Sequence, residues 1–397
     1  MDFKLTDEQI ARRNEHFAVC KELEKQRPVG FAAGGLESIY DTDEGWQYHL
    51  HCAKEFAKRG WLSHHWPREY GGEDGSMMDQ VFFSEARGYY GVPGADIFGY
   101  SMLAPTLLAA GNKCVKEKFL PGIASGDTMG CQLWSEPNAG SDLASLTSTA
   151  IRRGDEYVIN GQKTWSTGAH RADWGFGVFK TDLSAPKHHN LSFLLLDMKT
   201  PGITVNPILY MDMGHLYNEV YFDDVHVPAE NIVGEEGKGW QVTQTLSGFE
   251  RSSLEFVMVL QQQLEALVKY CNETRVNGEP LAKNLLIRNR LAGIACDVEA
   301  TCCLAYRVAD LQDKNQFSIF DASAVKVFVS ELGERMAFLA ADILGPYAQV
   351  KSSKWAPLEG FGEKGYQQCF VLTIAMGTNE IQRNIISWYG LGLPRMK

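Results

Sequence analysis

Two short segments, about thirty residues apart, carry side chains suited to a flat polar ligand. In residues 131–142 (CQLWSEPNAGSD), small residues at 139–141 let a ligand approach the backbone closely, and hydroxyls at 135 and 141 can hydrogen-bond a ring edge or a phosphate. In residues 160–167 (NGQKTWST), a turn leads into an aromatic side chain and a hydroxyl. An indole beside a donor hydroxyl suits an isoalloxazine, which needs one stacked face and hydrogen bonds to its heteroatoms.

Composition narrows the classes of protein. A chain of 397 residues is long enough for two or three packed lobes. Hydrophobic residues make up 45% and charged residues 22%, which is ordinary for a globular protein. The net charge of −11 argues against nucleic-acid binding, which needs clustered positive charge. It does not exclude a small ligand that carries phosphates, because a few local cations and backbone amides can hold such groups.

The sequence also bears on location. No apolar run approaches the ~20 residues of a membrane span. The polar start predicts a helix capped by Thr6, with Asp7 and Glu8 in its first turn, and not a signal peptide. The nine cysteines are odd in number and scattered, without any CxxC motif. We therefore expect a reducing, cytoplasmic location.

Hydrophobic periodicity divides the chain into three parts. Helical patterns dominate the first part, β-rich runs separated by turn pairs fill the second, and long helical patterns return in the third. We expect an N-terminal helical domain over residues 1–125, a mostly antiparallel β domain over 126–235 and a C-terminal helical domain over 236–397. The expected helices include 46–59, 101–120, 261–271, 284–312, 323–344 and 367–377, and the expected strands include 157–159, 191–196 and 220–222.

The two segments together form a recognisable signature. The pattern SEPxAGSD at 135–142, followed by GxKxWxT at 161–167, resembles the acyl-CoA dehydrogenase family. The resemblance includes WPxEYGG at 66–72 and GTNEIQR at 377–383, and so extends over essentially the whole chain. It implies an α+β multi-domain fold: an N-terminal helical domain, a middle antiparallel β domain and a C-terminal domain like a four-helix bundle, with FAD between the last two.

The resemblance assigns the cofactor contacts. Gly140 allows close backbone approach to FAD, Thr378 and Glu380 contact the rest of the cofactor, and Arg275 reaches the adenine end in a neighbouring subunit. This chain departs from the family's Arg-x-x-Phe-Gly run at 275–280 (RVNGEP) and from its Gly-Gly-x-Gly-Tyr stretch at 344–347 (LGPY). The side chains that line the flavin are implied to be Gln132, Trp134, Ser135, Ser141, Trp165 and Thr167.

The general base is the main departure from the family pattern. Many members carry a glutamate directly before the C-terminal Gly-Thr, where this chain has Met376. A thioether cannot accept the α-proton of a thioester, so the reaction needs another base. Members such as isovaleryl-CoA dehydrogenase carry a Glu-Arg pair on the helix after the β domain, which implies Glu250 as the base and Arg251 at the acyl-CoA site. Ser141 and the backbone N–H of Met376 are the other implied substrate contacts. Glu250 could instead be a solvated residue of a helix first turn, and Arg251 a surface ion-pair partner.

Two other features favour structural roles over chemistry. Asp96 lies where the resemblance places the wall of the acyl pocket, but a loop or helix-cap aspartate is the preferred interpretation. The His64-His65 and His188-His189 pairs lack the spacing of a metal site, so we expect no metal.

The resemblance further implies electron-transfer flavoprotein as the electron acceptor and a tetramer of one chain or of two paralogues. A glutamate on the earlier helix favours a branched, alicyclic or otherwise bulky acyl group. Three alternatives stay open: a variant reaction on the same fold (enoyl-CoA reduction, or oxidation with loss of a carboxylate or sulfinate), a non-catalytic partner subunit, and a flavin oxidase or monooxygenase.

Overall fold

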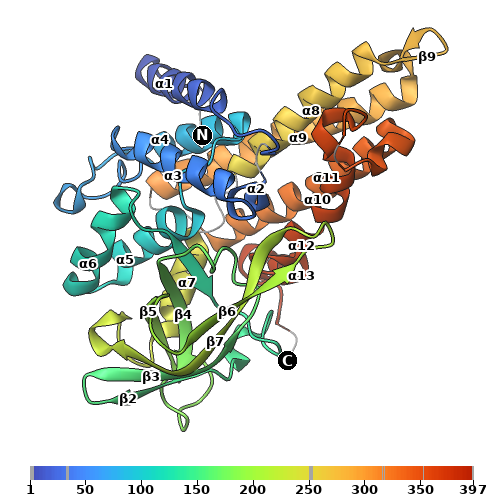
Figure 1. Cartoon of the computed structure of the whole chain (residues 1–397). Helices are drawn as coiled ribbons and strands as arrows, with labels where there is room; N and C mark the ends of the chain where they lie inside the picture. Colours follow the sequence, from blue (N-terminus) through green and yellow to red (C-terminus); the bar gives the residue numbers. More distant parts are fainter. Residues whose placement is uncertain are drawn as a thin grey trace. The chain divides into compact units, whose positions relative to one another are not determined.

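The computed structural model describes residues 4–32, 35–249, 254–314, 316, 318–351 and 353–395, without the side chain of Phe249. The chain forms two compact units, each assembled from separate stretches of sequence (Figure 1). Unit 1 comprises Met1–Gly35, Ser76–Val92 and Arg251–Lys397, and unit 2 comprises Leu36–Gly75 and Pro93–Glu250. The helix–sheet–helix order along the chain agrees with the prediction from periodicity.

Unit 2 is built on an eight-stranded sheet in the order β6-β7-β3-β2-β4-β5-β8, with β1 paired to β4. The pairings are antiparallel except those of β4 with β1 and β2. A register shift between Ile159 and Gly161 interrupts the β3–β7 ladder at the start of residues 160–167. The strands are β1 (Gly130–Leu133), β2 (Thr149–Arg153), β3 (Glu156–Lys163), β4 (Trp174–Lys180), β5 (Leu191–Asp197), β6 (Ile203–Leu209), β7 (His215–Pro228) and β8 (Ile232–Val233).

Helices complete unit 2. A π-helix, η2 (Ile97–Leu103), follows Asp96, whose carboxylate accepts from the backbone N–H groups of Phe98 and Gly99. The α-helices are α2 (Leu36–Tyr40), α3 (Asp43–Ala57), α5 (Ala104–Ala110), α6 (Lys113–Ala124) and α7 (Gly239–Phe249). The other helical turns are η1 (Arg68–Tyr70), η2 (Ile97–Leu103), η3 (Leu143–Ser145) and η4 (Ala229–Asn231).

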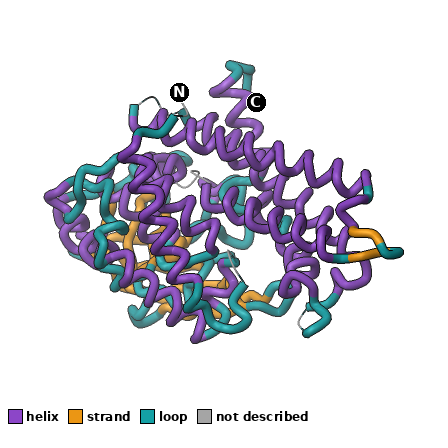
Figure 2. The backbone as a smooth tube through the Cα atoms, turned by 90° about the horizontal axis from the view of Figure 1, so that it is seen from above, coloured by secondary structure: helices purple, strands orange, loops and turns teal. Residues whose placement is uncertain are grey.

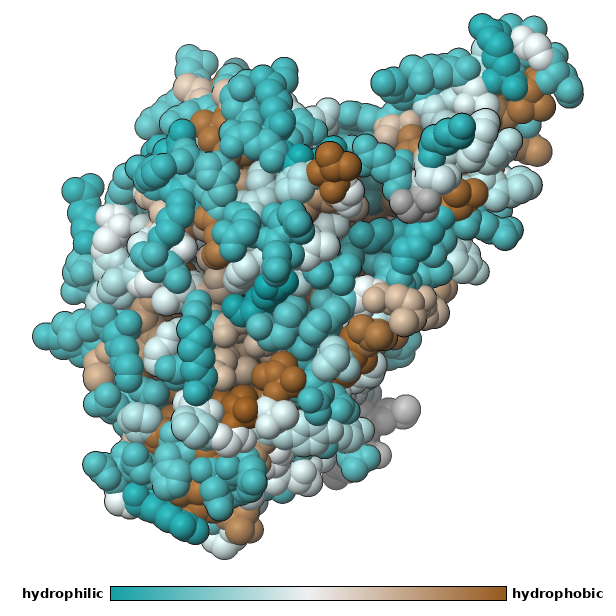
Figure 3. Space-filling view, in the orientation of Figure 1, coloured by the Kyte–Doolittle hydropathy of each residue, from teal (hydrophilic) through white to brown (hydrophobic). Residues whose placement is uncertain are grey.

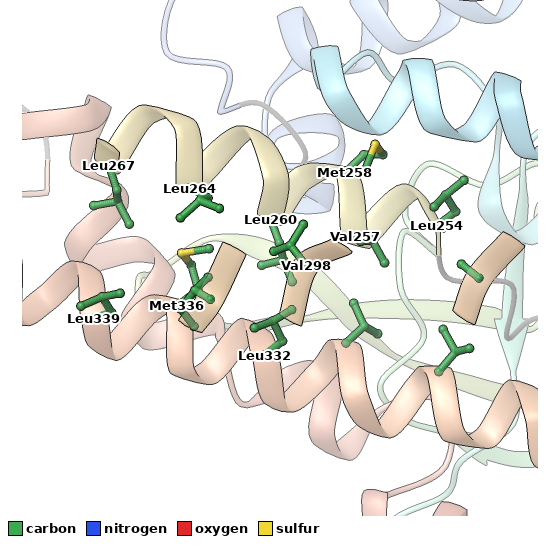
Figure 4. Packing of buried hydrophobic residues seen from close by; sticks show 14 of the residues in the cluster. Leu254, Val257, Met258, Leu260, Leu264, Leu267, Val298, Leu332, Met336 and Leu339 are labelled. Carbon is green, nitrogen blue, oxygen red and sulfur yellow. The ribbon is translucent and has the colours of Figure 1, made fainter. Parts of the chain in front are cut away.

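Unit 1 is helical, and its core lies among α4, α8, α9 and α10. Apolar residues of α8 recur at helical spacing and face α9 and α10, as Figure 4 shows for Leu260, Val298 and Leu332. Figure 2 shows that strand is rare outside the main sheet, in the short β9–β10 hairpin. The elements are α1 (Asp7–Glu24), α4 (Met77–Tyr90), α8 (Leu254–Glu273), β9 (Arg275–Val276), β10 (Glu279–Pro280), η5 (Leu281–Lys283), α9 (Leu285–Asp313), α10 (Ile319–Leu344), η6 (Gly345–Gln349), η7 (Pro357–Gly360), α11 (Phe361–Gln368), α12 (Val371–Ile374), α13 (Asn379–Ile385) and η8 (Ile386–Gly390).

The sequence predicted some helix ends correctly and others not. The predicted Thr6 cap is confirmed, because Thr6 and Gln9 form a reciprocal capping box. The single helix expected over 101–120 is wrong: the chain breaks at Gly111, and Asn112 caps a new helix by accepting from Val115 N at 3.0 Å. The helix expected over 367–377 is also wrong, since α11 and α12 end before a turn at Met376 and Gly377.

The surface seen in Figure 3 is mostly hydrophilic, with small groups of hydrophobic side chains among hydrophilic ones. None of the helices in the described residues is long and apolar enough to cross a membrane. All nine cysteines are free thiols.

Candidate active site

A buried ion pair joins the two sequence segments inside unit 2. Lys163, at the end of β3, is 0% exposed, and its Nζ lies 2.9 Å from Glu136 Oε1. The same ammonium donates to the carbonyls of Val178, at 2.9 Å, and of Trp134, at 3.2 Å. One side chain thereby ties together the ends of β1, β3 and β4, and brings residues 131–142 next to residues 160–167.

Glu136 is held as a carboxylate. It accepts hydrogen bonds from Thr147 N at 2.6 Å, from Thr147 Oγ1 at 2.8 Å and from Ser148 N at 3.0 Å. Burial alone would raise the pKa of this carboxyl, but Lys163 and the donors from Ser148 and Thr147 together lower it to about 2. Glu136 is therefore a structural anion and not a proton acceptor.

Trp165 follows this ion pair in an unusual conformation. Its φ is 61°, in the left-handed region, and its side chain is 58% exposed. A left-handed non-glycine residue costs about 1–3 kcal/mol, so its neighbours must fix it. Thr164 N donates to Ser135 O at 2.8 Å, and Ser166 N donates to Asn218 O at 2.9 Å. The turn thus leaves Trp165 exposed, with the ring of Tyr217 in edge-to-face contact with its indole.

The described residues of unit 2 fit a bound flavin. The space next to Gly140 is open, because an added Cβ there would meet nothing within 4 Å. The indole Nε1 of Trp134 and the Oγ of Ser166 are buried polar atoms without a hydrogen-bond partner among the described residues. An exposed indole with unpaired donors nearby is what a planar ligand with polar edges would cover. The remaining predicted flavin residues lie on the same two segments: Gln132, Ser135 and Thr167 are half-buried and Ser141 is exposed.

In unit 1, Met376 also adopts a left-handed conformation, with φ 57°, followed by Gly377 with φ 77°. Gln382 Nε2 donates to the Met376 carbonyl at 2.7 Å. A Cβ at Gly377 would lie 2.6 Å from the same Gln382 nitrogen, and the left-handed φ also favours glycine there. The turn ends at Thr378, which caps α13.

Lys326 of α10 holds this turn by hydrogen bonds. It is 0% exposed, and its Nζ donates to the Gly377 carbonyl at 2.7 Å and to Asn379 Oδ1 at 2.8 Å. Ser330 and Glu331 hold the Asn379 amide, at 3.0 and 3.1 Å from its Nδ2. The buried cation therefore fixes the backbone at 376–378.

The other predicted contacts to FAD in unit 1 lie on two different elements. Glu380 is exposed in the first turn of α13, and the pKa of its carboxyl is lowered, first by its own backbone N–H and then by the Thr378 hydroxyl. Arg275 lies on β9, where it is exposed and donates to the Gly278 carbonyl at 3.1 Å. The roles of these residues remain predictions.

Glu250 and Arg251, the predicted base and its neighbour, lie outside the described residues. The helix that leads to them, α7, is described up to Phe249. Their roles therefore stay predictions as well.

Asp96 has the structural role that the sequence favoured. It is buried and accepts from Gly130 N at 2.7 Å, Gly99 N at 2.8 Å and Phe98 N at 3.2 Å, so it caps η2 and joins it to β1. Burial raises the pKa of its carboxyl to about 6, against the effect of those three donors.

This raised pKa predicts a pH dependence of stability. Because the folded state retains the proton that the unfolded state loses near pH 4, the contribution of Asp96 should decrease as pH rises from about 4 to about 6. Measuring the free energy of unfolding against pH for the native protein and for Asp96→Asn tests this. An identical slope in both proteins would refute it.

Sequence reasoning missed three anchoring groups: the Glu136–Lys163 pair, Lys326, and Asn218. Glu136 and Lys163 belong to the recognised motifs, but nothing in either motif indicated that the two charges pair. Lys326 stands alone in the apolar run 322–329 (ASAVKVFV), which indicates a buried charge. Nothing local marked Asn218. Among the described residues, no cluster of three His, Cys, Asp or Glu side chains could hold a metal ion.

Comparison with known proteins agrees with this architecture. Family models match in three consecutive parts: acyl-CoA dehydrogenase N-terminal domain over residues 31–127, middle domain over 131–225 and C-terminal domain over 237–388. Acyl-CoA dehydrogenase FadE26 of Mycobacterium tuberculosis is 35% identical over 408 residues, covering 100% of this chain and 99% of the relative. The ChsE4-ChsE5 complex of Mycobacterium tuberculosis is similar in structure, with TM-score 0.88, 32% identity and full coverage of both chains. A structure named Tcur3481-Tcur3483 steroid ACAD is also similar, with TM-score 0.87, 29% identity and full coverage of both chains.

The chain therefore belongs to the acyl-CoA dehydrogenase family, whose members are oxidoreductases acting on CH–CH groups. The predicted family and its three-part fold class are confirmed.

Proposed function

We propose that this protein is an FAD-dependent acyl-CoA dehydrogenase that desaturates the α,β bond of an acyl-CoA thioester. The observation that carries the proposal is the exposed, left-handed Trp165, together with the Trp134 and Ser166 polar atoms that have no partner in the described part of the chain and the open space at Gly140. When bound, FAD would accept the substrate β-hydrogen as hydride. Gln132, Trp134, Ser135, Ser141 and Thr167 would hold its ring system together with Trp165, and Thr378, Glu380 and Arg275 the rest of the cofactor.

Side chains and backbone groups of this chain would then remove the α-proton of the substrate. Glu250 would take the α-hydrogen as a proton, because Met376 cannot. The backbone N–H of Met376, in a turn fixed by Gln382 and Lys326, would donate to the thioester carbonyl and acidify that hydrogen. Arg251 and Ser141 would contact the acyl-CoA.

We also propose a bulky acyl group, branched, alicyclic or steroid-derived. The position of the proposed base after the β domain supports this choice, and so does the similarity to a protein named as a steroid acyl-CoA dehydrogenase. We further propose that electron-transfer flavoprotein accepts the electrons and that the protein is a tetramer in the cytoplasm. The proposed domain boundaries lie near residues 125 and 235.

A second candidate is a subunit of a hetero-oligomer that leaves catalysis to its partner. Met376 at the usual glutamate position favours it, as do two similar structures whose names pair two proteins. A chain expressed alone that purifies without flavin and binds flavin only with a second chain would favour this candidate. Variant reactions on the same fold would be recognised by a small molecule released during turnover, by reduction of an enoyl-CoA, or by oxygen consumption.

Anaerobic titration of the purified protein with a panel of acyl-CoAs tests the proposal. We expect the visible flavin absorbance to bleach with a bulky acyl-CoA and much less with straight-chain ones. A flavin-loaded protein that no acyl-CoA reduces would overturn the proposed dehydrogenase activity, and bleaching by straight chains alone would overturn the proposed substrate class.

A further inference from the structure

Asn218 of β7 holds the residue next to Trp165 from two sides. Its backbone carbonyl accepts from Ser166 N at 2.9 Å, and its side-chain Nδ2 donates to the Ser166 carbonyl at 3.0 Å. Asn218 is fully buried, so neither bond competes with water. Trp165 therefore lies between two anchored residues, Thr164 on Ser135 and Ser166 on Asn218.

The hydrogen bonds of Asn218 determine the orientation of its amide and the tautomers of two neighbouring histidines. The Ser166 carbonyl can only accept, so the amide nitrogen must face it and the amide oxygen must face His215 Nε2, at 2.8 Å. His215 Nε2 is then the donor. Asn218 Nδ2 also lies 3.2 Å from His170 Nδ1, which must accept. Since His170 Nε2 lies 3.2 Å from the Tyr40 carbonyl, it carries the ring proton.

We propose that Asn218 is a positioning residue that keeps Trp165 in its left-handed conformation for stacking on the flavin, and that the hydrogen bonds of His170 and His215 keep Asn218 in place. The part that concerns stacking deepens the proposed function and rests on it. We call the two hydrogen bonds between Asn218 and Ser166 the clamp. The clamp depends only on bonds within this chain.

The clamp should respond to protons through His170. The rings of His170 and His215 stack with centroids 3.9 Å apart, so a charge on one opposes a charge on the other. The groups that face them are the carbonyl and ring of Tyr40, Arg171, which pairs with Asp43 at 2.7 Å, and Asp41, which accepts from His215 N at 2.9 Å. Burial first, and then His215 and Arg171, lower the pKa of His170.

Protonation would place a hydrogen on His170 Nδ1, directly opposite the Asn218 Nδ2 donor. Two donors would then face each other and that hydrogen bond would be lost. Because the folded pKa is lowered, the unfolded chain binds the proton more readily, and the clamp weakens as pH falls through the range below the ordinary histidine value.

Two substitutions give opposite pH responses. His170→Gln can accept from Asn218 and donate to Tyr40 but cannot titrate, so its clamp should no longer weaken in acid. Asn218→Asp cannot donate to Ser166 or to His170 at neutral pH. In acid, however, protonated His170 can donate to the new carboxylate. The native protein should loosen on acidification, whereas Asn218→Asp should tighten.

The readouts are amide hydrogen exchange of residues 164–169, which needs no cofactor, and the rate of FAD release. At neutral pH we expect Asn218→Asp to increase both by about tenfold, the effect of losing one or two neutral hydrogen bonds. At each pH the native protein is compared with His170→Gln, so intrinsic exchange rates cancel. The exposed residues Asn206 and His226 provide matched controls, Asn206→Asp and His226→Gln, which should leave both readouts and their pH dependence unchanged.

The outcomes separate the two proposals. Unchanged exchange in Asn218→Asp, or the same pH response in all variants, overturns the clamp. Faster exchange without faster FAD release overturns the positioning of the flavin by Trp165 while leaving the clamp. A native protein that never retains FAD overturns the proposed function, while the exchange measurement still tests the clamp.

Discussion

Glu250→Gln is expected to retain FAD and lose about 10²–10⁴-fold in the rate of flavin reduction by acyl-CoA, the usual contribution of a general base. Glutamine preserves the shape of the side chain and one acceptor oxygen but cannot accept the α-proton. Because Met376 occupies the position of the usual family glutamate, no second carboxylate is assigned to the same carbon. The loss should therefore appear in the chemical step and not in cofactor content.

Rapid mixing with acyl-CoA under anaerobic conditions measures that step directly. Glu235→Gln is the matched control, because Glu235 is an exposed glutamate just before α7 and should leave the rate unchanged. Near-native reduction by Glu250→Gln would remove Glu250 from the mechanism. Adding Met376→Glu to that variant should restore part of the rate if both carboxylates reach the same carbon, and no recovery would count against this shared geometry.

Local sequence signals were enough for the order of elements and for several helix ends. The Thr6 cap, the apolar repeat of α8 and the alternation in the strands all act over a few residues, so they can be read without a structure. The signal at Gly111-Asn112 was equally local, a glycine followed by an N-cap residue, and the prediction of a continuous helix passed over it.

The turn at Met376 shows what local patterns cannot supply. Its apolar surroundings are compatible with a helix, yet Gln382, Lys326 and Asn379 hold the backbone out of one. Lys326 is about fifty residues away in sequence, and periodicity carries no information on such pairs. The same holds for Asn218 and Ser166, which meet only because β7 pairs with β3. The motifs supplied the proposed flavin contacts, but not the buried groups that hold their backbone.

The second large effect concerns the ion pair that joins the two motifs. Lys163→Met should destabilise the protein by about 3–5 kcal/mol, because it leaves the buried Glu136 carboxylate without its cation. Equilibrium unfolding in denaturant measures the change. The flavin absorbance should decrease with it, since Lys163 also holds the Trp134 carbonyl beside the proposed flavin contacts.

A second substitution separates the charge from the packing. Glu136→Gln in the Lys163→Met background removes the unpaired charge, while the glutamine oxygen can still accept from Thr147 or Ser148. This double variant should recover much of the lost stability, as expected when a buried charge and not a missing contact causes the loss. If the double variant is no more stable than Lys163→Met, the destabilisation comes from packing and the electrostatic account is wrong.

An exposed ion pair on the same unit provides a reference for the stability change expected at Lys163. Lys187 Nζ lies 2.7 Å from both carboxylate oxygens of Asp142, a contact as short as that of Lys163, but both side chains are about half exposed or more. Water screens such a pair, so Lys187→Met should change the stability by at most about 1 kcal/mol. Equal losses at positions 163 and 187 would mean that burial does not decide the strength of these contacts. A large loss at 163 alone would identify the Glu136–Lys163 pair as the electrostatic link that sets the two motifs side by side.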